Sequence, residues 1–148
     1  MKITNKLIAL AIVCAGIPVT VLAKSQDTLA GIYLVTISVD GLRQQISAVA
    51  DCDESGAMVE YDFVPPGKLE VGEGHWSRAA QGFTINYTTP LENGDKRMVT
   101  GFVTRSTPAN HLTGSGKVQV IKQDGTVVET RNVTVTAVES QSRFAAKR

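Results

Sequence analysis

The sequence predicts an all-β protein, folded as one small antiparallel up-and-down β-barrel of seven or eight strands. Segments rich in β-branched and aromatic residues recur along the chain, separated by short turn sequences. Three of these turns are strong hairpin signals: Asp40-Gly41, Asn93-Gly94 and Asp124-Gly125. Short connections favour a sheet that closes on itself, which also removes exposed strand edges. The alternative is a Greek-key β-sandwich, which needs at least one long crossing connection.

Residues 1–23 have the pattern of a cleaved signal peptide. Lys2 and Lys6 precede an apolar run over Leu7 to Ile17, and Ala23 ends a stretch suited to cleavage. The alternative of a membrane anchor is disfavoured because the run is shorter than the roughly 20 residues of a span. A lipid-carrying Cys14 is also disfavoured, because no small residue directly precedes it. We therefore expect a periplasmic or secreted protein with no transmembrane span after cleavage.

The rest of the chain divides into a barrel domain over residues 24–140 and a disordered basic tail over 141–148. Loss of Lys2 and Lys6 with the signal would leave 13 basic against 14 acidic residues and move the net charge from +1 to −1. A nearly neutral domain of mixed charge is not suited to nucleic acid or to an anionic bilayer. Cys52 would be the one cysteine left, and its acidic neighbours favour a buried, inert thiol.

The first half of the barrel begins with a strand over Leu29 to Val39. Leu42 to Cys52 fits helical spacing better than strand alternation, but the preceding hairpin turn favours a strand. Ala57 to Val64 alternates cleanly, with Val59, Tyr61 and Phe63 expected to face inward. Pro65-Pro66-Gly67 ends that strand because proline gives a ladder no N–H.

The second half is built around a hairpin over Gly72 to Thr88, preceded by a short strand over Lys68 to Val71. This hairpin holds the single tryptophan of the chain, Trp76, and a row of large residues at alternate positions after Gly82. Strands are then expected over three further ranges: Lys96 to Ser106, Leu112 to Lys122 and Thr126 to Val138.

The opening of the first strand, Leu29-Ala30-Gly31-Ile32-Tyr33, resembles the Gly-x-Trp/Tyr opening of lipocalin-like, calycin-type exported barrels. The later series of hairpins, including Leu112 to Gly116, is similar to the meander of the same family. Tyr33 stands where that family usually has tryptophan. The resemblance implies an eight-stranded barrel with an interior able to hold one small molecule, and it supplies no ligand-binding residues.

Seven side chains are the candidate ligand-binding residues because they combine aromatic surface with an expected inward direction. They are Tyr33, Tyr61, Trp76, Arg78, Phe83, Tyr87 and Phe102. A filled core is the favoured interpretation of the rings, and a ligand cavity is the alternative. Arg78 is expected at the barrel mouth with its head in water, the alternative being an inward arginine that binds a ligand carboxylate.

Signals for chemistry are weak. His75 is the best acid–base candidate, but catalysis would require it to converge with Arg78 and a carboxylate in a cavity. The acidic residues at 51, 53 and 54 lack the spacing of a calcium loop. Neither catalytic residues, a metal site nor a cofactor is predicted. We expect a non-enzymatic barrel that binds a small apolar ligand, or alternatively a structural or protein-interaction module of the envelope.

Overall fold

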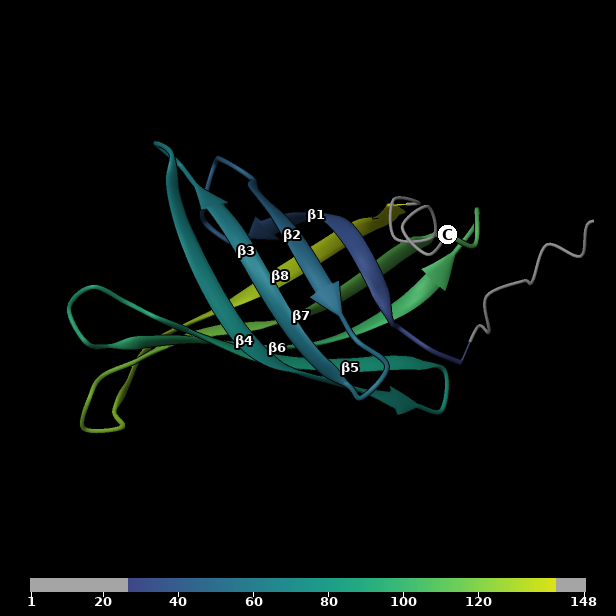
Figure 1. Cartoon of the computed structure of the whole chain (residues 1–148). Helices are drawn as coiled ribbons and strands as arrows, with labels where there is room; N and C mark the ends of the chain where they lie inside the picture. Colours follow the sequence, from purple (N-terminus) through teal and green to yellow (C-terminus); the bar gives the residue numbers. More distant parts are fainter. Residues whose placement is uncertain (1–26, 141–148) are drawn as a thin grey trace, which may run out of the picture.

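The computed structural model describes residues 27–140, which form a single closed antiparallel β-barrel (Figure 1). The predicted signal peptide (1–23) and basic tail (141–148) lie outside the described residues. Eight strands follow one another around the barrel in chain order. They are β1 (Gly31–Val39), β2 (Ile46–Cys52), β3 (Ala57–Val64), β4 (Lys68–Ala79), β5 (Gly82–Pro90), β6 (Lys96–Ser106), β7 (His111–Ile121) and β8 (Val127–Ser140).

Closure comes from the pairing of β1 with β8. The register runs from Ile32 opposite Ser140 to Val39 opposite Val133. Each strand also pairs with its neighbour in sequence, so all the connections are hairpins. The predicted up-and-down barrel is confirmed, and the Greek-key alternative is wrong because no strand crosses over another. No helix among the described residues is long and apolar enough to cross a bilayer.

Two segments whose secondary structure was ambiguous or divided in the sequence are both regular strands. The ambiguous stretch before Cys52 is a strand from Ile46 onward, and the helical alternative is wrong because each of its residues from Ile46 to Cys52 pairs with β1. The short strand expected over Lys68 to Val71 and the first arm of the hairpin are one continuous strand, β4. At the β2–β3 turn, the Asp53 carboxylate accepts hydrogen bonds from the backbone N–H of Ser55 and Ala57.

The inward face of β3 is the opposite of the expected one. Met58, Glu60 and Asp62 point into the barrel, whereas Tyr61 and Phe63 are 37% and 50% exposed on the outside. Directly paired residues share a face of a sheet. Ala50 is opposite both Tyr33 and Glu60, so Glu60 must point inward with Tyr33. The alternation within β3 was read correctly, but the choice of face was wrong.

On β6 the inward residues are Val99 and Val103, which lie opposite Tyr87 and Phe83 of β5. Phe102 is therefore directed outward and is 38% exposed, which corrects the inward direction expected for it. The same register places Val99 and Val103 in the core. Two further core residues, Cys52 and Leu112, are also buried, so the predicted burial of the thiol is confirmed.

One end of the barrel is closed by aromatic packing. The rings of Trp76 and Phe83 meet edge to face, with centroids 5.7 Å apart. The Trp76 indole Nε1 donates a hydrogen bond to the carbonyl oxygen of Asp53 at 3.0 Å, which ties the β2–β3 turn to β4. Arg105 also lies at this end, with its guanidinium 6.0 Å from the centre of the Phe83 ring. Its Nη2 donates to the carbonyl oxygen of Thr28 at 2.7 Å.

Gly74 permits the close approach of β4 and β5, because a Cβ atom there would lie 1.9 Å from the carbonyl oxygen of Asn86. We expect Gly74→Ala to lower the free energy of unfolding by about 1–3 kcal/mol, the usual cost of overpacking. Gly101→Ala is the matched control, since its Cβ would be 3.2 Å from the nearest atom, the Ser115 carbonyl oxygen. Urea unfolding of both variants measures the difference. Equal stabilities would contradict the steric role of Gly74.

Candidate functional site

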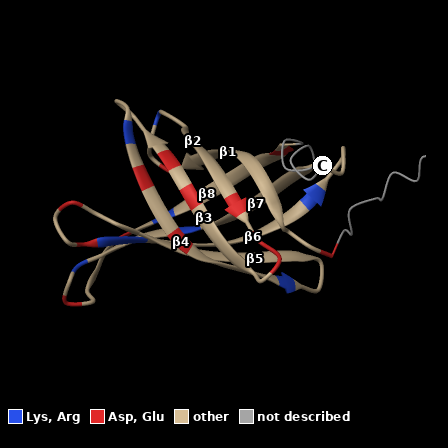
Figure 2. Ribbon diagram, viewed as in Figure 1, with Lys and Arg blue, Asp and Glu red and all other residues tan. Residues whose placement is uncertain are grey.

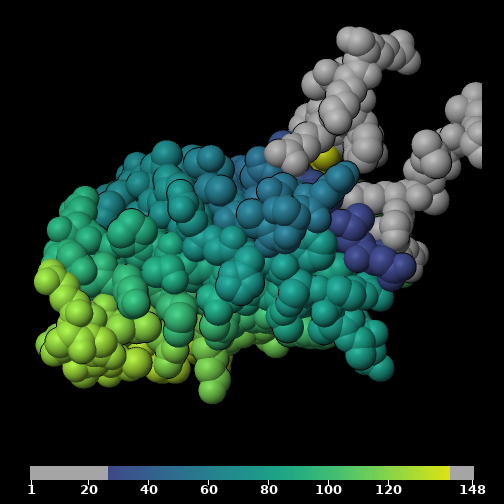
Figure 3. Space-filling model, turned by 60° about the horizontal axis from the view of Figure 1, so that its bottom comes forward, coloured from purple at the N-terminus to yellow at the C-terminus, as the bar shows by residue number. Residues whose placement is uncertain are grey.

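The barrel interior contains a cavity of about 190 Å³. Much of its wall is aliphatic, including Val35 and Ile37 of β1, Val118 of β7 and Val133 of β8. On the face seen in Figure 3, the side chains of neighbouring strands form a continuous outer surface. A dry apolar cavity of about 150 Å³ is large enough to bind benzene. The cavity therefore has room for one small molecule.

The cavity opens at the end opposite Trp76. Its lining reaches Leu42 in the β1–β2 turn, which is 51% exposed, and Glu129 and Arg131 near the start of β8. Glu129 and Arg131 form an ion pair beside this opening. The Arg131 Nη1 also donates to the carbonyl oxygen of Asp40, so that β8 is joined to the β1–β2 turn. The opening thus combines an exposed leucine with a paired charge at its rim.

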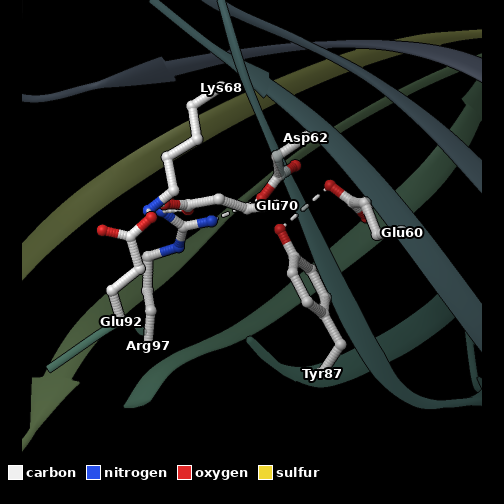
Figure 4. Close-up of polar contacts among 7 residues, drawn as sticks. All are labelled: Glu60, Asp62, Lys68, Glu70, Tyr87, Glu92 and Arg97. Atoms are coloured by element: carbon white, nitrogen blue, oxygen red, sulfur yellow. Dashed lines mark hydrogen bonds and ion pairs between the residues drawn. The ribbon is translucent and has the colours of Figure 1, made fainter. Parts of the chain in front are cut away.

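A polar group of side chains lies at one side of the cavity, supplied by β3, β4, β5 and β6. Figure 2 shows acidic positions following one another along β3 and β4. Four members line the cavity: Glu60, Asp62, Tyr87 and Arg97. We call these four, together with Glu70, Lys68 and Glu92, the interior polar cluster (Figure 4).

Tyr87 connects strands β5 and β3 within the interior polar cluster. Its hydroxyl donates a hydrogen bond to Oε1 of Glu60 at 2.9 Å, from β5 to β3 (Figure 4). Gly72 of the intervening strand β4 leaves room for the ring, because a Cβ atom there would lie 2.7 Å from Cδ2 of Tyr87. A glycine on β4 is therefore the structural condition for this contact.

Arg97 of β6 binds two carboxylates. Its Nη2 lies 2.6 Å from Oδ2 of Asp62 on β3, and its Nη1 lies 2.7 Å from Oε2 of Glu70 on β4. Thr89, which is opposite Arg97 on β5, is fully buried. The Arg97 side chain is 16% exposed and that of Asp62 is 2% exposed. Buried charges of this kind persist only when paired, so the fork of Arg97 stabilises both acids.

Lys68 connects the cluster to solvent. Its Nζ lies 3.0 Å from Oε1 of Glu70 and 3.2 Å from Oε1 of the exposed Glu92. Burial acts to raise the pKa of Glu70, but hydrogen bonding and charge from Lys68 and Arg97 outweigh it and lower that pKa. Glu70 therefore remains a carboxylate near neutral pH.

Glu60 and Asp62 behave differently from Glu70. Burial, reinforced by the charge of Asp62, raises the pKa of Glu60 from 4.5 to about 8. Burial also raises the pKa of Asp62, although Arg97 opposes the shift. The negative charge of Asp62 favours the protonated form of Glu60, whereas the nearby Arg97 favours the charged form of Asp62. Near neutral pH the pair holds one proton, carried by Glu60.

The seven residues proposed from the sequence separate into three groups. Tyr33 and Tyr87 line the cavity. Trp76 and Phe83 pack at the closed end, and Tyr61 and Phe102 are on the outer surface. Arg78 also lies at the closed end, and its side chain is 45% exposed. Its Nη2 forms an ion pair with Oδ1 of Asp27 at 3.0 Å. The interpretation of Arg78 as a rim residue agrees with this position.

Tyr33 sits between the cavity and the closed end. Burial raises its pKa to about 12, and the negative charge of Glu139 adds to the shift. Arg105, whose Nη1 lies 3.7 Å from Oε2 of Glu139, acts in the opposite direction. Arg105 is 72 residues from Tyr33 in the chain, so the sequence alone does not associate the two residues.

The arrangement required for His75 chemistry does not form. His75 is exposed on the outer face of β4, whereas Arg78 has the opposite parity and lies near the end of the same strand, with its side chain 45% exposed. Positions of opposite parity on one strand point to opposite faces and cannot converge in one cavity. Among residues 27–140, no group of three or more His, Cys, Asp or Glu side chains is arranged to hold a metal ion.

The outer surface carries a continuous line of apolar residues across five strands. Val138 of β8, Leu34 of β1, Val49 of β2, Tyr61 of β3 and Val71 of β4 are successive partners in the ladder. We call these five residues the outer apolar row. Leu34 is the most exposed of them, at 59%. Exposed apolar residues that are contiguous often indicate an interaction surface.

The residues missed by sequence reasoning are Glu60, Asp62, Glu70 and Arg97. Glu60 and Asp62 share the parity opposite to Tyr61 and Phe63, and charged residues at alternate positions of a strand usually face solvent. The inward direction of Glu60 follows from the cross-strand register, in which the inward Ala50 is opposite Glu60. That register is a property of the folded sheet and could not be read from β3 alone.

No protein-family model matches the chain, and no curated protein matches it. The class defined by the structure is that of a closed eight-stranded antiparallel barrel, compatible with a calycin-like architecture. A functional interpretation must therefore be based on the cavity and the interior polar cluster.

The raised pKa of Glu60 makes stability depend on pH. A proton bound more tightly in the folded state stabilises the fold fully below about pH 4.5, and this contribution is lost as the pH rises to about 8. Glu60→Gln keeps a neutral hydrogen-bonding group, so its free energy of unfolding should gain on that of the wild type across this range. The gain should approach about 1.4 kcal/mol per pH unit. Urea unfolding from pH 5 to pH 9 measures it.

The matched control for this titration is Glu73→Gln, an exposed acid on the outer face of β4. Its stability curve should run parallel to that of the wild type. Parallel curves for Glu60→Gln as well would show that Glu60 ionises normally in the folded barrel.

Proposed function

We propose that the barrel is an exported, non-enzymatic binding protein that holds a small, mainly apolar ligand in its interior. The observation that carries the proposal is the cavity of about 190 Å³, which is open at the end formed by the β1–β2 and β7–β8 turns. Ligand sites are typically concave, mostly apolar and provided with a few polar groups that fix orientation. The aliphatic wall and the interior polar cluster satisfy both parts of that description.

The rigidity of the barrel supports the same function. Continuous pairing through all eight strands fixes the positions of the wall residues before a ligand enters. A preformed site does not have to order its side chains on binding, which favours affinity. The signal pattern of residues 1–23 supports export to the periplasm or the medium, where a freely diffusing ligand would be met.

Toluene is a suitable first probe because its size approaches that of the cavity. We expect saturating toluene to raise the midpoint of thermal unfolding, since a ligand that binds the folded state alone stabilises it. Ala137→Leu places extra volume inside the cavity next to Val35 and should reduce the toluene-induced shift at least twofold. Differential scanning calorimetry with and without toluene measures both shifts.

Ala57→Leu is the control for this experiment, because it makes the same change at an exposed position of β3. It should retain the full toluene-induced shift. A wild-type barrel whose unfolding midpoint and NMR spectrum are unaffected by toluene would overturn the proposed function.

A second candidate function is an interaction module of the envelope that binds through its outer face. The specific observation in its favour is the outer apolar row, in which Leu34 is 59% and Val71 38% exposed. A second copy of the chain is the simplest partner, because the row would be contributed equally by both copies in a two-fold interface.

Leu34→Lys combined with Tyr61→Lys tests this candidate. Sedimentation equilibrium should show dimers of the wild type and monomers of the double variant, with both proteins equally stable because the changed positions are exposed. A wild-type protein that remains monomeric at millimolar concentration and captures no envelope protein would exclude the interaction module. That outcome leaves the ligand-binding proposal unaffected.

A further inference from the structure

We propose that the ligand of the cavity carries one positively charged amine, held by Glu60 and Asp62, on an otherwise apolar body. This inference rests on the proposed ligand-binding function and specifies its chemical class. It follows from the distribution of charge within the interior polar cluster (Figure 4). The cavity that four of these residues line is otherwise walled mostly by aliphatic side chains.

The cluster contains more acids than cations. Four of its members are carboxylic acids, whereas two, Arg97 and Lys68, are cations. Both nitrogens Nη1 and Nη2 of Arg97 are engaged, by Glu70 and Asp62 respectively. Lys68 is engaged by Glu70 and Glu92 at the rim. Within the part of the chain that the structure describes, no ion pair reaches Glu60.

Glu60 is also almost completely enclosed where it faces the cavity. It is 3% exposed, and its Oε1 accepts a hydrogen bond from the Tyr87 hydroxyl. A buried carboxylate without a cation is costly, so the site holds a proton instead. Burial and the charge of Asp62 accordingly raise the pKa of Glu60 to about 8. At neutral pH Glu60 is therefore protonated.

A ligand ammonium group can replace this proton. Three N–H donors suit the adjacent oxygens of Glu60 and Asp62, which lie on the same face of β3 two positions apart. On binding, the Glu60 proton passes to solvent, and the resulting carboxylate pairs with the ammonium. A ligand carboxylate would instead face the negative charge of Asp62 and would have to separate Arg97 from its acids.

The volume limits the apolar body. A cavity of about 150 Å³ accepts the six carbon atoms of benzene. The observed volume of about 190 Å³ therefore suits a ligand of about seven to nine non-hydrogen atoms. Hexylamine, hexanol and hexanoate have comparable chains and differ in the charge of the polar end, so they are matched probes.

Isothermal titration calorimetry of the full chain with these three compounds tests the proposal. At pH 7 we expect hexylamine to bind at least tenfold more tightly than hexanol, with hexanoate weakest. Titrations in phosphate and in Tris should show release of close to one proton per hexylamine bound. Glu60→Gln should reduce hexylamine to the affinity of hexanol and leave hexanol binding unchanged, while Glu73→Gln should behave as the wild type.

The outcomes separate this inference from the function on which it rests. Hexanol or hexanoate binding as tightly as hexylamine, or hexylamine binding without proton release, would overturn the amine specificity while preserving a ligand-binding barrel. Failure of all three compounds and of toluene to bind would overturn both. The measurement of proton release uses the wild-type protein, so the test stands even if Glu60→Gln folds poorly.

Discussion

The pairing of β1 with β8 is the constraint on which the rest of the structure depends. It closes the ladder, so every strand has two neighbours and no edge remains open within the described barrel. Closure also fixes which face of each strand points inward, because residues in register must share a side. Once Tyr33 is inside, Ala50 and then Glu60 follow from pair to pair around the wall.

The interior polar cluster is a direct consequence of that register. Glu60 and Asp62 are placed inside because their cross-strand neighbours are. The cost of burying Asp62 is offset by its ion pair with Arg97 of β6, and Glu60 is hydrogen-bonded by Tyr87. Gly72 and Gly74 of β4 allow β5 and the Tyr87 ring to approach closely. The cluster is therefore assembled from β3, β4, β5 and β6 and has no counterpart in any single segment.

Asymmetry between the two ends of the barrel gives the cavity its direction. Trp76 and Phe83 fill one end, while the other presents Leu42 and a paired Glu129 and Arg131 around an opening. A ligand entering through this opening meets aliphatic side chains from β1, β7 and β8 on one side and the polar cluster on the other. The excess of acid in that cluster is what distinguishes this interior from a purely hydrophobic one.

The sequence by itself predicted seven or eight strands and their order around the barrel. Turn signals such as Asp124-Gly125 and alternation within segments such as Ala57 to Val64 are local, and short connections leave few ways to arrange the strands. Sequence also identified Tyr33 and Tyr87, because each ring shares a strand parity with other apolar residues of its segment.

Only the tertiary structure decided which face of β3 and β6 is buried. As a result, Tyr61 and Phe102 lie on the outer surface, and the side chains of Glu60, Asp62 and Arg97 line the cavity. The physical reason is that a strand with two alternating faces has no intrinsic inside. Its orientation is set by pairing with neighbours and, for Glu60, by partners 27 residues away in the chain.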